Sequence, residues 1–376
     1  MLYLHIPYCK KACVYCDFHF SVNTNGLDRM VSAICREIEI RKDYLDSSEP
    51  LKTVYFGGGT PSILGKNHIE RIFQTIRENY FLDVNAEITL EANPDDLTHE
   101  KLAELAATPI NRLSIGIQSF FDDDLQFMNR AHSAQEAVKS IHNSKAAGFD
   151  NLSIDLIYGL PNSELSRWAK NLELAFSLPV KHLSCYGLTL EPKTKLNKMV
   201  SLGQVAIPSD ENFLEQFGYL MEAAISNGFE HYEISNFAKP GFRSNHNSRY
   251  WNDAHYVGVG PSAHSYNGIS RQWNVSSNSL YVDAINNGEV PFKLESLSNA
   301  DKYNEYVMTR LRTLEGVHLE ELGKRFGLRF KEHFFEIITT YLNDGSVSSL
   351  NNSRFSLTRK GQFIADRIAA DLFWTE

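Results

Sequence analysis

Apolar residues in the first half of the chain follow two alternating patterns. Short runs rich in valine, isoleucine and leucine are separated by longer segments in which apolar residues recur every three or four positions. The short runs indicate buried strands and the longer segments indicate amphipathic helices. We expect strands at residues 2–7, 52–58, 86–92, 112–118, 151–159 and 182–188. We expect helices at residues 28–45, 68–79, 99–107, 134–148 and 164–177.

This alternation predicts an α/β fold with a parallel sheet, because parallel neighbours need helical crossovers between them. Six strand–helix repeats fall short of the eight of a closed barrel, so a partial (β/α)6 barrel and an open doubly wound sheet both fit. In either fold ligands bind at the C-terminal ends of the strands. Several polar or glycine residues follow strands directly, so we expect the functional site there.

The pattern changes after residue 208. Residues 210–228 predict an amphipathic helix that ends at Gly228, and residues 229–235 predict a strand. Residues 240–275 are rich in glycine, asparagine, serine, histidine and aromatics, so we expect a long functional loop. The segments after residue 297 predict helices, a short strand pair and a last helix, a small α+β domain of winged-helix type.

Three regions follow from these patterns. We expect a partial barrel at residues 1–200, a barrel extension with the long loop at 201–290, and the small C-terminal domain at 291–376.

Composition restricts the class of protein. The hydrophobic fraction of 43% and charged fraction of 22% are ordinary for a soluble globular protein. The net charge of -9 argues against general nucleic-acid binding, so we expect no such partner. No apolar run approaches the roughly 20 residues that span a bilayer, and the N-terminus does not resemble a signal peptide. We therefore expect a cytoplasmic protein, in which clustered cysteines favour metal or redox chemistry over disulfides.

Three of the five cysteines, Cys9, Cys13 and Cys16, form a C-x3-C-x2-C pattern after the first strand. Thiolates bind zinc or iron–sulfur clusters. Structural zinc needs four protein ligands, and His5 or His19 could complete such a site. We favour a [4Fe–4S] cluster in which three irons are held by these cysteines and the fourth accepts an exchangeable ligand.

Other candidate residues follow later strands. Gly57 to Thr60 allow close backbone approach, and consecutive N–H groups there could bind an anion. Glu91 ends one strand, where it could also cap the next helix. The Gln118 amide and the Arg130 guanidinium suit ribose and carboxylate recognition. Asp155 lies in an otherwise apolar strand, where a buried carboxylate needs partners.

The cysteine spacing, with the aromatic Tyr15 before the last cysteine, resembles the signature of radical S-adenosylmethionine (SAM) enzymes. That resemblance implies that SAM chelates the open iron, and that an electron from the cluster cleaves SAM to a 5′-deoxyadenosyl radical. In such proteins a glycine motif like residues 57–59 holds the SAM amino group.

Six stretches between residues 1 and about 270 resemble the oxygen-independent coproporphyrinogen III oxidase group: YLHIPYC, FGGGTPS, LSIGIQSF, MNRAHS, DLIYGLP and HLSCYGLT. This group is notable for two SAM sites. By this resemblance the SAM contacts are Tyr3, Gly58, Gly59, Thr60, Glu91, Gln118, Arg130, Asp155, Thr189 and His264.

Two departures from the oxidases point to a subfamily. The oxidases carry a further cysteine in a C-x-C arrangement, whereas Asp17 and Phe18 follow Cys16. They also carry an N-terminal extension over the substrate, whereas this chain starts at the first strand. In both respects this chain resembles the heme chaperone subfamily of HemW type.

A third feature agrees: HNSRYW at residues 246–251 is similar to the H-N-x-x-Y-W heme motif of that subfamily. Histidine can ligate heme iron, and aromatic rings offer flat surface to a porphyrin. We expect His246 to ligate heme, with His264 as a second candidate.

Two hypotheses share these cofactors. The first is a heme chaperone that binds heme, the cluster and SAM, and delivers heme to an acceptor apoprotein, including a membrane protein met transiently. The second is an oxidase that decarboxylates coproporphyrinogen III propionates to give protoporphyrinogen IX. Either would take electrons from a donor such as flavodoxin or ferredoxin. A radical SAM enzyme acting on RNA is a third hypothesis, which the acidic charge disfavours.

Overall fold

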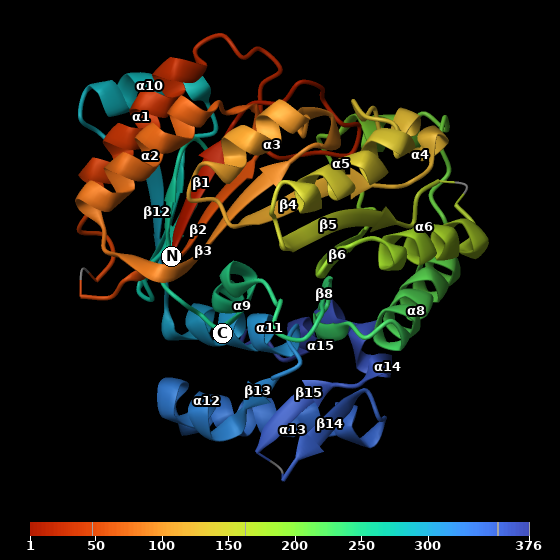
Figure 1. Cartoon of the computed structure of the whole chain (residues 1–376). Helices are drawn as coiled ribbons and strands as arrows, with labels where there is room; N and C mark the ends of the chain where they lie inside the picture. Colours follow the sequence, from red (N-terminus) through yellow and green to blue (C-terminus); the bar gives the residue numbers. More distant parts are fainter. Residues whose placement is uncertain (47, 162, 352, 376) are drawn as a thin grey trace.

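The computed structural model describes residues 1–46, 48–161, 163–351 and 353–375 (Figure 1). Six parallel strands form the centre of the larger part of the molecule, and their helices lie on one face of the sheet. The strands are β1 (Leu2–Ile6), β2 (Leu51–Gly58), β3 (Leu82–Ala92), β4 (Arg112–Gln118), β5 (Asn151–Tyr158) and β6 (His182–Gly187). The helices are α1 (Leu27–Ile40), α2 (Lys66–Asn79), α3 (His99–Ala106), α4 (Asp122–Phe127), α5 (Ala134–Ala146) and α6 (Leu165–Ser177).

The strand order decides between the two expected architectures. The sheet runs β7-β8-β6-β5-β4-β3-β2-β1-β9, so the first six strands are neighbours in sequence order. A doubly wound sheet would reverse its order at a switch point, whereas a barrel keeps it. The fold is therefore a partial (β/α)6 barrel, the one of the two fitting architectures that was expected for residues 1–200.

Alternation along each strand separates the core from the concave face of the sheet. Leu4, Phe56 and Leu90 are fully buried against the helices, and each such side chain contributes about 1.5–3 kcal/mol through burial. Their sequence neighbours Tyr55 and Glu91 point to the concave face, because successive side chains in a strand alternate. The polar side chains needed for chemistry therefore gather on that face.

The barrel extension adds strands to both edges of this sheet. Strand β8 pairs antiparallel with β6, and β9 pairs parallel with β1. The elements between β6 and the C-terminal domain are α7 (Lys195–Ser201), α8 (Asp210–Ser226), β7 (Glu230–Glu233), β8 (Asn236–Ala238), α9 (Asn245–Trp251), β9 (Val257–Val259), β10 (His264–Tyr266), β11 (Ser270–Asn274), α10 (Asn278–Asn286) and β12 (Phe292–Ser296).

The expectation of one long loop at residues 240–275 was wrong. This segment holds helix α9 and three short strands. Helix α9 starts where Ser244 caps it and where Glu87 of β3 accepts hydrogen bonds from the backbone N–H groups of Asn245 and His246, each at 2.9 Å. Such a short helix depends on contacts distant in sequence, so its local pattern did not reveal it.

The C-terminal domain has its own apolar core, which includes Tyr303, Leu322, Phe334 and Phe355. Its small sheet has the order β13-β15-β14, and helices precede and follow it, as expected for a winged-helix-like domain. Its elements are α11 (Asn299–Leu311), β13 (Val317–His318), α12 (Leu319–Phe326), α13 (Leu328–Asn343), β14 (Val347–Leu350), β15 (Arg354–Leu357), α14 (Arg359–Gln362) and α15 (Ala365–Asp371).

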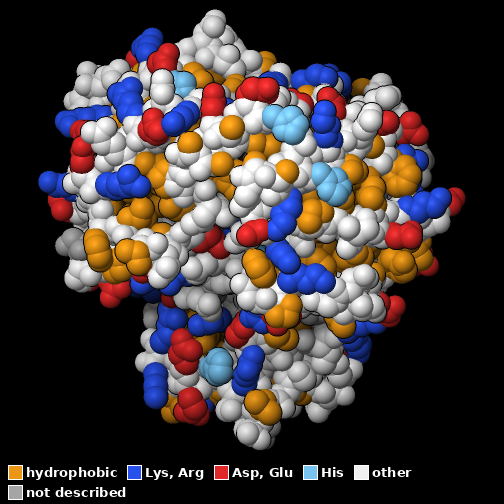
Figure 2. All heavy atoms as spheres, in the orientation of Figure 1, with side chains coloured by type: hydrophobic (Ala, Val, Ile, Leu, Met, Phe, Trp, Pro, Cys, Tyr) orange, Lys and Arg blue, Asp and Glu red, His pale blue; other side chains and the backbone are white. Residues whose placement is uncertain are grey.

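The two parts differ in size but share the character of their surface. Figure 2 shows basic and acidic side chains interspersed over both the barrel body and the smaller C-terminal lobe.

The sheet β10-β11-β12 crosses residue 290, where the C-terminal domain was expected to begin one residue later, because strand β12 pairs with β11. Within the described part of the chain, no helix is both long and apolar enough to cross a membrane.

Candidate cofactor site

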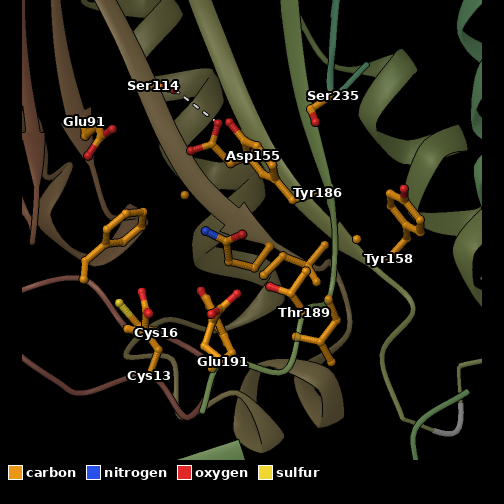
Figure 3. A pocket seen from close by; sticks show the side chains of 18 of the residues that line it. Cys13, Cys16, Glu91, Ser114, Asp155, Tyr158, Tyr186, Thr189, Glu191 and Ser235 are labelled. Atoms are coloured by element: carbon orange, nitrogen blue, oxygen red, sulfur yellow. Dashed lines mark hydrogen bonds between the residues drawn. The ribbon is translucent and has the colours of Figure 1, made fainter. Parts of the chain in front are cut away.

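A cavity of about 930 Å³ opens on the concave face at the C-terminal ends of the barrel strands (Figure 3). Its lining continues to the C-terminal domain. It gathers residues from every barrel strand or from the loop that follows it. The predicted site residues that line it are Cys9, Cys13, Tyr15, Cys16, Gly58, Gly59, Thr60, Glu91, Gln118, Arg130, Asp155 and Thr189. Tyr3, His246 and His264 do not line it.

The loop that carries the three cysteines is tied down along its length. The backbone N–H of Cys9 donates to the Ser21 carbonyl at 3.0 Å, and that of Val14 donates to the Met128 carbonyl at 3.2 Å. The Asn129 side chain donates to the Ala12 carbonyl at 2.7 Å. The first bond closes the cysteine loop on itself and the other two join it to the segment after α4, so the thiols lie at fixed positions at one end of the cavity.

The chemistry of these thiols fits an iron–sulfur cluster. All three cysteines are free and partly accessible. Burial raises the pKa of the Cys9 thiol and raises that of Cys16 to about 11. Without a cation the Cys9 and Cys16 thiols therefore stay protonated, whereas bound iron would take them as thiolates and release protons. In the described ranges no three His, Cys, Asp or Glu side chains lie close enough together to hold a single ion. A [4Fe–4S] cluster would not require such a group, because each cysteine would bind a different iron.

The glycine loop presses directly against the cysteine loop. The Gly59 N–H donates to the Ile6 carbonyl at 2.8 Å, and the Thr60 N–H donates to the Tyr8 carbonyl at 2.7 Å. A side chain on Gly59 would lie 2.6 Å from the Tyr8 oxygen, so glycine is required here. Because these amides are already engaged, the expected anion site of consecutive N–H groups is wrong. The loop can offer its carbonyl oxygens to a cationic amino group instead.

Glu91 stands at the centre of the site. Its carboxylate accepts hydrogen bonds from the Tyr55 hydroxyl at 2.8 Å and from the Gly58 N–H at 3.2 Å. Burial raises its pKa to about 7, although both hydrogen bonds oppose that shift. A cationic ligand such as an ammonium group would restore the ionised form.

Arg130 lies beside Cys13, and the Gln118 amide and the Arg130 guanidinium both lie against Gly116. Gln118 ends β4 at a register shift and has a φ of 68°, a strained backbone that is common at functional sites. Arg130 donates to the Cys13 sulfur at 3.3 Å and to the Asn93 side-chain oxygen at 2.7 Å, while its buried Nε has no partner among the described residues. That unused donor suits the carboxylate of a small ligand.

Asp155 lies further along the concave face. It accepts a hydrogen bond from the Ser114 hydroxyl at 3.2 Å, the contact drawn in Figure 3. Burial raises its pKa to about 6. Thr189 follows β6 and is exposed to the cavity, where its hydroxyl can reach a ligand.

Two of the predicted SAM contacts lie beside the cavity and not in its wall. The Tyr3 ring stacks on Tyr55, with ring centroids 6.1 Å apart, and its hydroxyl is 3.3 Å from His5 Nδ1. His264 lies on β10 with its ring stacked on Trp273 at 6.1 Å. Both therefore support neighbouring rings in this structure.

His246 lies behind the site, on the first turn of α9. Its ring packs on Tyr55 with centroids 4.8 Å apart, and its Nδ1 is hydrogen-bonded to the Thr53 hydroxyl at 2.8 Å. Burial lowers its pKa to about 3, so the ring is neutral at physiological pH. No described residue forms a hydrogen bond with Nε2. A neutral imidazole with one nitrogen held and the other free is suited to ligate a metal.

The sequence did not single out several residues that complete the site. Asn93 holds Arg130 and also donates to the Thr60 hydroxyl at 3.2 Å. Tyr55 joins Glu91 to His246. Tyr55 lies in one expected strand and Asn93 directly follows another, but only the folded sheet shows what they contact.

Comparisons with known proteins agree with this geometry. Residues 3–175 match the radical SAM superfamily, and residues 297–364 match the HemN C-terminal domain. The heme chaperone HemW of Lactococcus lactis is 34% identical over 360 residues, 96% of this chain and 93% of that protein. The heme chaperone HemW of Bacillus subtilis is 32% identical over 97% of both chains.

The fold matches a solved structure as well. The coproporphyrinogen III oxidase HemN of Escherichia coli, described as a radical SAM enzyme, superposes with a TM-score of 0.86 over 99% of this chain and 89% of that one, at 23% identity. From its near full-length similarity to the chaperones, together with the cysteine loop and cavity at the strand ends, the chain belongs to the HemW family within the radical SAM superfamily.

Proposed function

We propose that this protein is a heme chaperone, which binds heme and passes it to an acceptor protein. The observation that carries the proposal is the similarity to two proteins named heme chaperone HemW, at 34% and 32% identity over nearly the whole length. That similarity extends through the barrel, the extension with the 246–251 motif and the C-terminal domain.

Two cofactors belong to the proposal. The three cysteines would hold a [4Fe–4S] cluster, and the residues around Glu91 would hold SAM at one or two sites. When bound, these groups supply one-electron chemistry. The chain itself contributes a fixed cysteine loop, an acidic site for a cationic amino group, and the unused Nε donor of Arg130 for a carboxylate.

His246 is the residue that would ligate the heme iron. Its Nδ1 can donate to the Thr53 hydroxyl, which orients the ring and leaves the Nε2 lone pair for iron. The lowered pKa of the His246 ring supports this role, because no proton competes with iron for the ring nitrogen at neutral pH. The acceptor protein, which could be a membrane protein, and an electron donor of flavodoxin or ferredoxin type are further parts of the proposal.

Heme titration under anoxia tests the proposal. We expect the purified chain with reconstituted cluster to bind hemin stoichiometrically, and His246→Ala to change the heme absorption spectrum and weaken binding. His142→Ala is the matched control, because His142 is an exposed histidine of α5. Identical spectra and affinities for wild type and His246→Ala would remove His246 as a ligand.

A turnover assay separates the chaperone from the oxidase. The protein, SAM, a reductant and coproporphyrinogen III are combined without oxygen, and porphyrin products are separated by chromatography. We expect no protoporphyrinogen IX. Formation of that product at many equivalents per protein would replace the chaperone proposal by the oxidase hypothesis.

A further inference from the structure

The main cavity reaches well beyond the residues assigned to the cluster and SAM. Its far end is lined by the C-terminal domain, including Arg312 after α11 and Phe363, Asp366 and Arg367 around α15. Nothing in the cysteine motif or the glycine loop accounts for these residues, which lie more than a hundred positions later in the chain.

The two ends of the cavity carry opposite charge. The cysteine end combines two cations with four carboxylates: Lys11, Arg130, Asp17, Glu91, Asp155 and Glu191. At the far end Arg312 and Arg367 outnumber the single carboxylate of Asp366. A cationic sulfonium nucleotide is therefore favoured at the cysteine end, whereas the far end favours an anion.

Arg312 has donors to spare. Its Nη1 donates to Asp366 at 3.1 Å, but the Asp366 side chain is 90% exposed, so water screens this pair. Among the described residues Nη2 has no hydrogen-bond partner, and Arg367 forms no ion pair. The Arg312 guanidinium lies 5.4 Å from the ring centre of Trp251, the last residue of the 246–251 motif.

The walls between the two ends are apolar and aromatic. Phe213 and Phe217 of α8 and Phe363 of the C-terminal domain line the cavity, and the rings of Phe217 and Phe363 meet edge to face with centroids 5.6 Å apart. A ligand matched to this region is flat and apolar, with carboxylates at one edge. Resting on the proposed function, we infer that Arg312 and Arg367 bind the propionate carboxylates of heme, so that the C-terminal domain orients the porphyrin.

Comparison of hemin with hemin dimethyl ester tests this inference, because the ester keeps the ring and iron but masks both carboxylates. Anoxic titrations of the cluster-loaded protein are followed by absorption. We expect wild type to bind hemin at least about tenfold more tightly than the ester, the effect of losing a charge-assisted hydrogen bond. In the double variant Arg312→Gln, Arg367→Gln this preference should fall below about twofold.

Arg359→Gln is the matched control, since Arg359 of α14 contacts Glu222 and the Gly218 carbonyl outside the cavity. It should keep the wild-type preference. Unchanged cluster absorption and thermal melting show that the variants are folded. The inference is overturned if the double variant keeps the full preference for hemin, or if wild type binds both compounds equally. In either case the proposed function would still stand. A wild type that binds neither compound removes the proposed function as well.

Discussion

Replacing Gly59 with alanine should displace the loop that carries the three cysteines proposed to hold the cluster. The new Cβ would lie 2.6 Å from the Tyr8 oxygen, 2.8 Å from the Ile6 oxygen and 2.9 Å from the Tyr8 nitrogen. All three atoms belong to the backbone, so no side-chain rotation can relieve the overlap. Because Tyr8 directly precedes Cys9, the displacement reaches the first of the three cysteines proposed to hold the cluster.

The expected loss of stability follows from the contacts that must shift. The Gly59 and Thr60 N–H groups donate to the same strand end, at 2.8 Å and 2.7 Å. Separating the loops weakens both hydrogen bonds, each worth about 1 kcal/mol, and losing about half of each costs about 1 kcal/mol together. Overpacking adds about 1–3 kcal/mol. We therefore expect Gly59→Ala to lower the free energy of unfolding by about 2–4 kcal/mol.

Urea unfolding of the apoprotein, followed by circular dichroism, measures this free energy without interference from metal release. Iron and sulfide content after reconstitution measures cluster binding, which should fall in parallel. Gly65→Ala is the control, because Gly65 has a φ of -74° and its Cβ would meet only the His68 ring, at 3.9 Å. Equal stability and equal cluster content in the two variants would refute the reasoning.

Three further predictions follow from the site. Each of the variants Cys9→Ala, Cys13→Ala and Cys16→Ala should lack the iron–sulfur absorption band. The control Cys35→Ala, at a buried thiol of α1, should keep the band. A band retained in any of the first three variants would contradict the proposed ligand assignment. Thr53→Val should weaken hemin binding about threefold to tenfold by releasing His246 Nδ1, and unchanged hemin affinity would exclude this support. Burial raises the pKa of Glu91 to about 7 from 4.5, so between these values the folded apoprotein binds a proton more tightly than the unfolded chain. The charged Glu91 therefore lowers the free energy of unfolding above about pH 7. In urea unfolding, the Glu91→Gln variant should be more stable than wild type at about pH 8 but not at about pH 5. A gain in stability that is independent of pH would show that the charge is not the cause.

The periodicity of the chain predicted six parallel strands joined by helices, and the strand order then decided for the partial barrel over the doubly wound sheet. Strand and helix patterns report which face of each element is apolar, and burial of those faces drives the layers together. The predicted strand at residues 86–92 nevertheless begins four residues earlier, at Leu82, because pairing with β2 extends it beyond its apolar part. Element boundaries depend on such neighbours.

For the site, the sequence alone determined the residue types: three cysteines at a set spacing, a glycine run and carboxylates at strand ends. Only the tertiary structure decided which of them share one cavity, because that depends on the parallel register of six strands. It also directed His246 toward Thr53 and Arg312 toward Trp251, through contacts that join residues 193 and 61 positions apart. Local patterns carry no information about such contacts, since side-chain direction is set by partners that folding brings near.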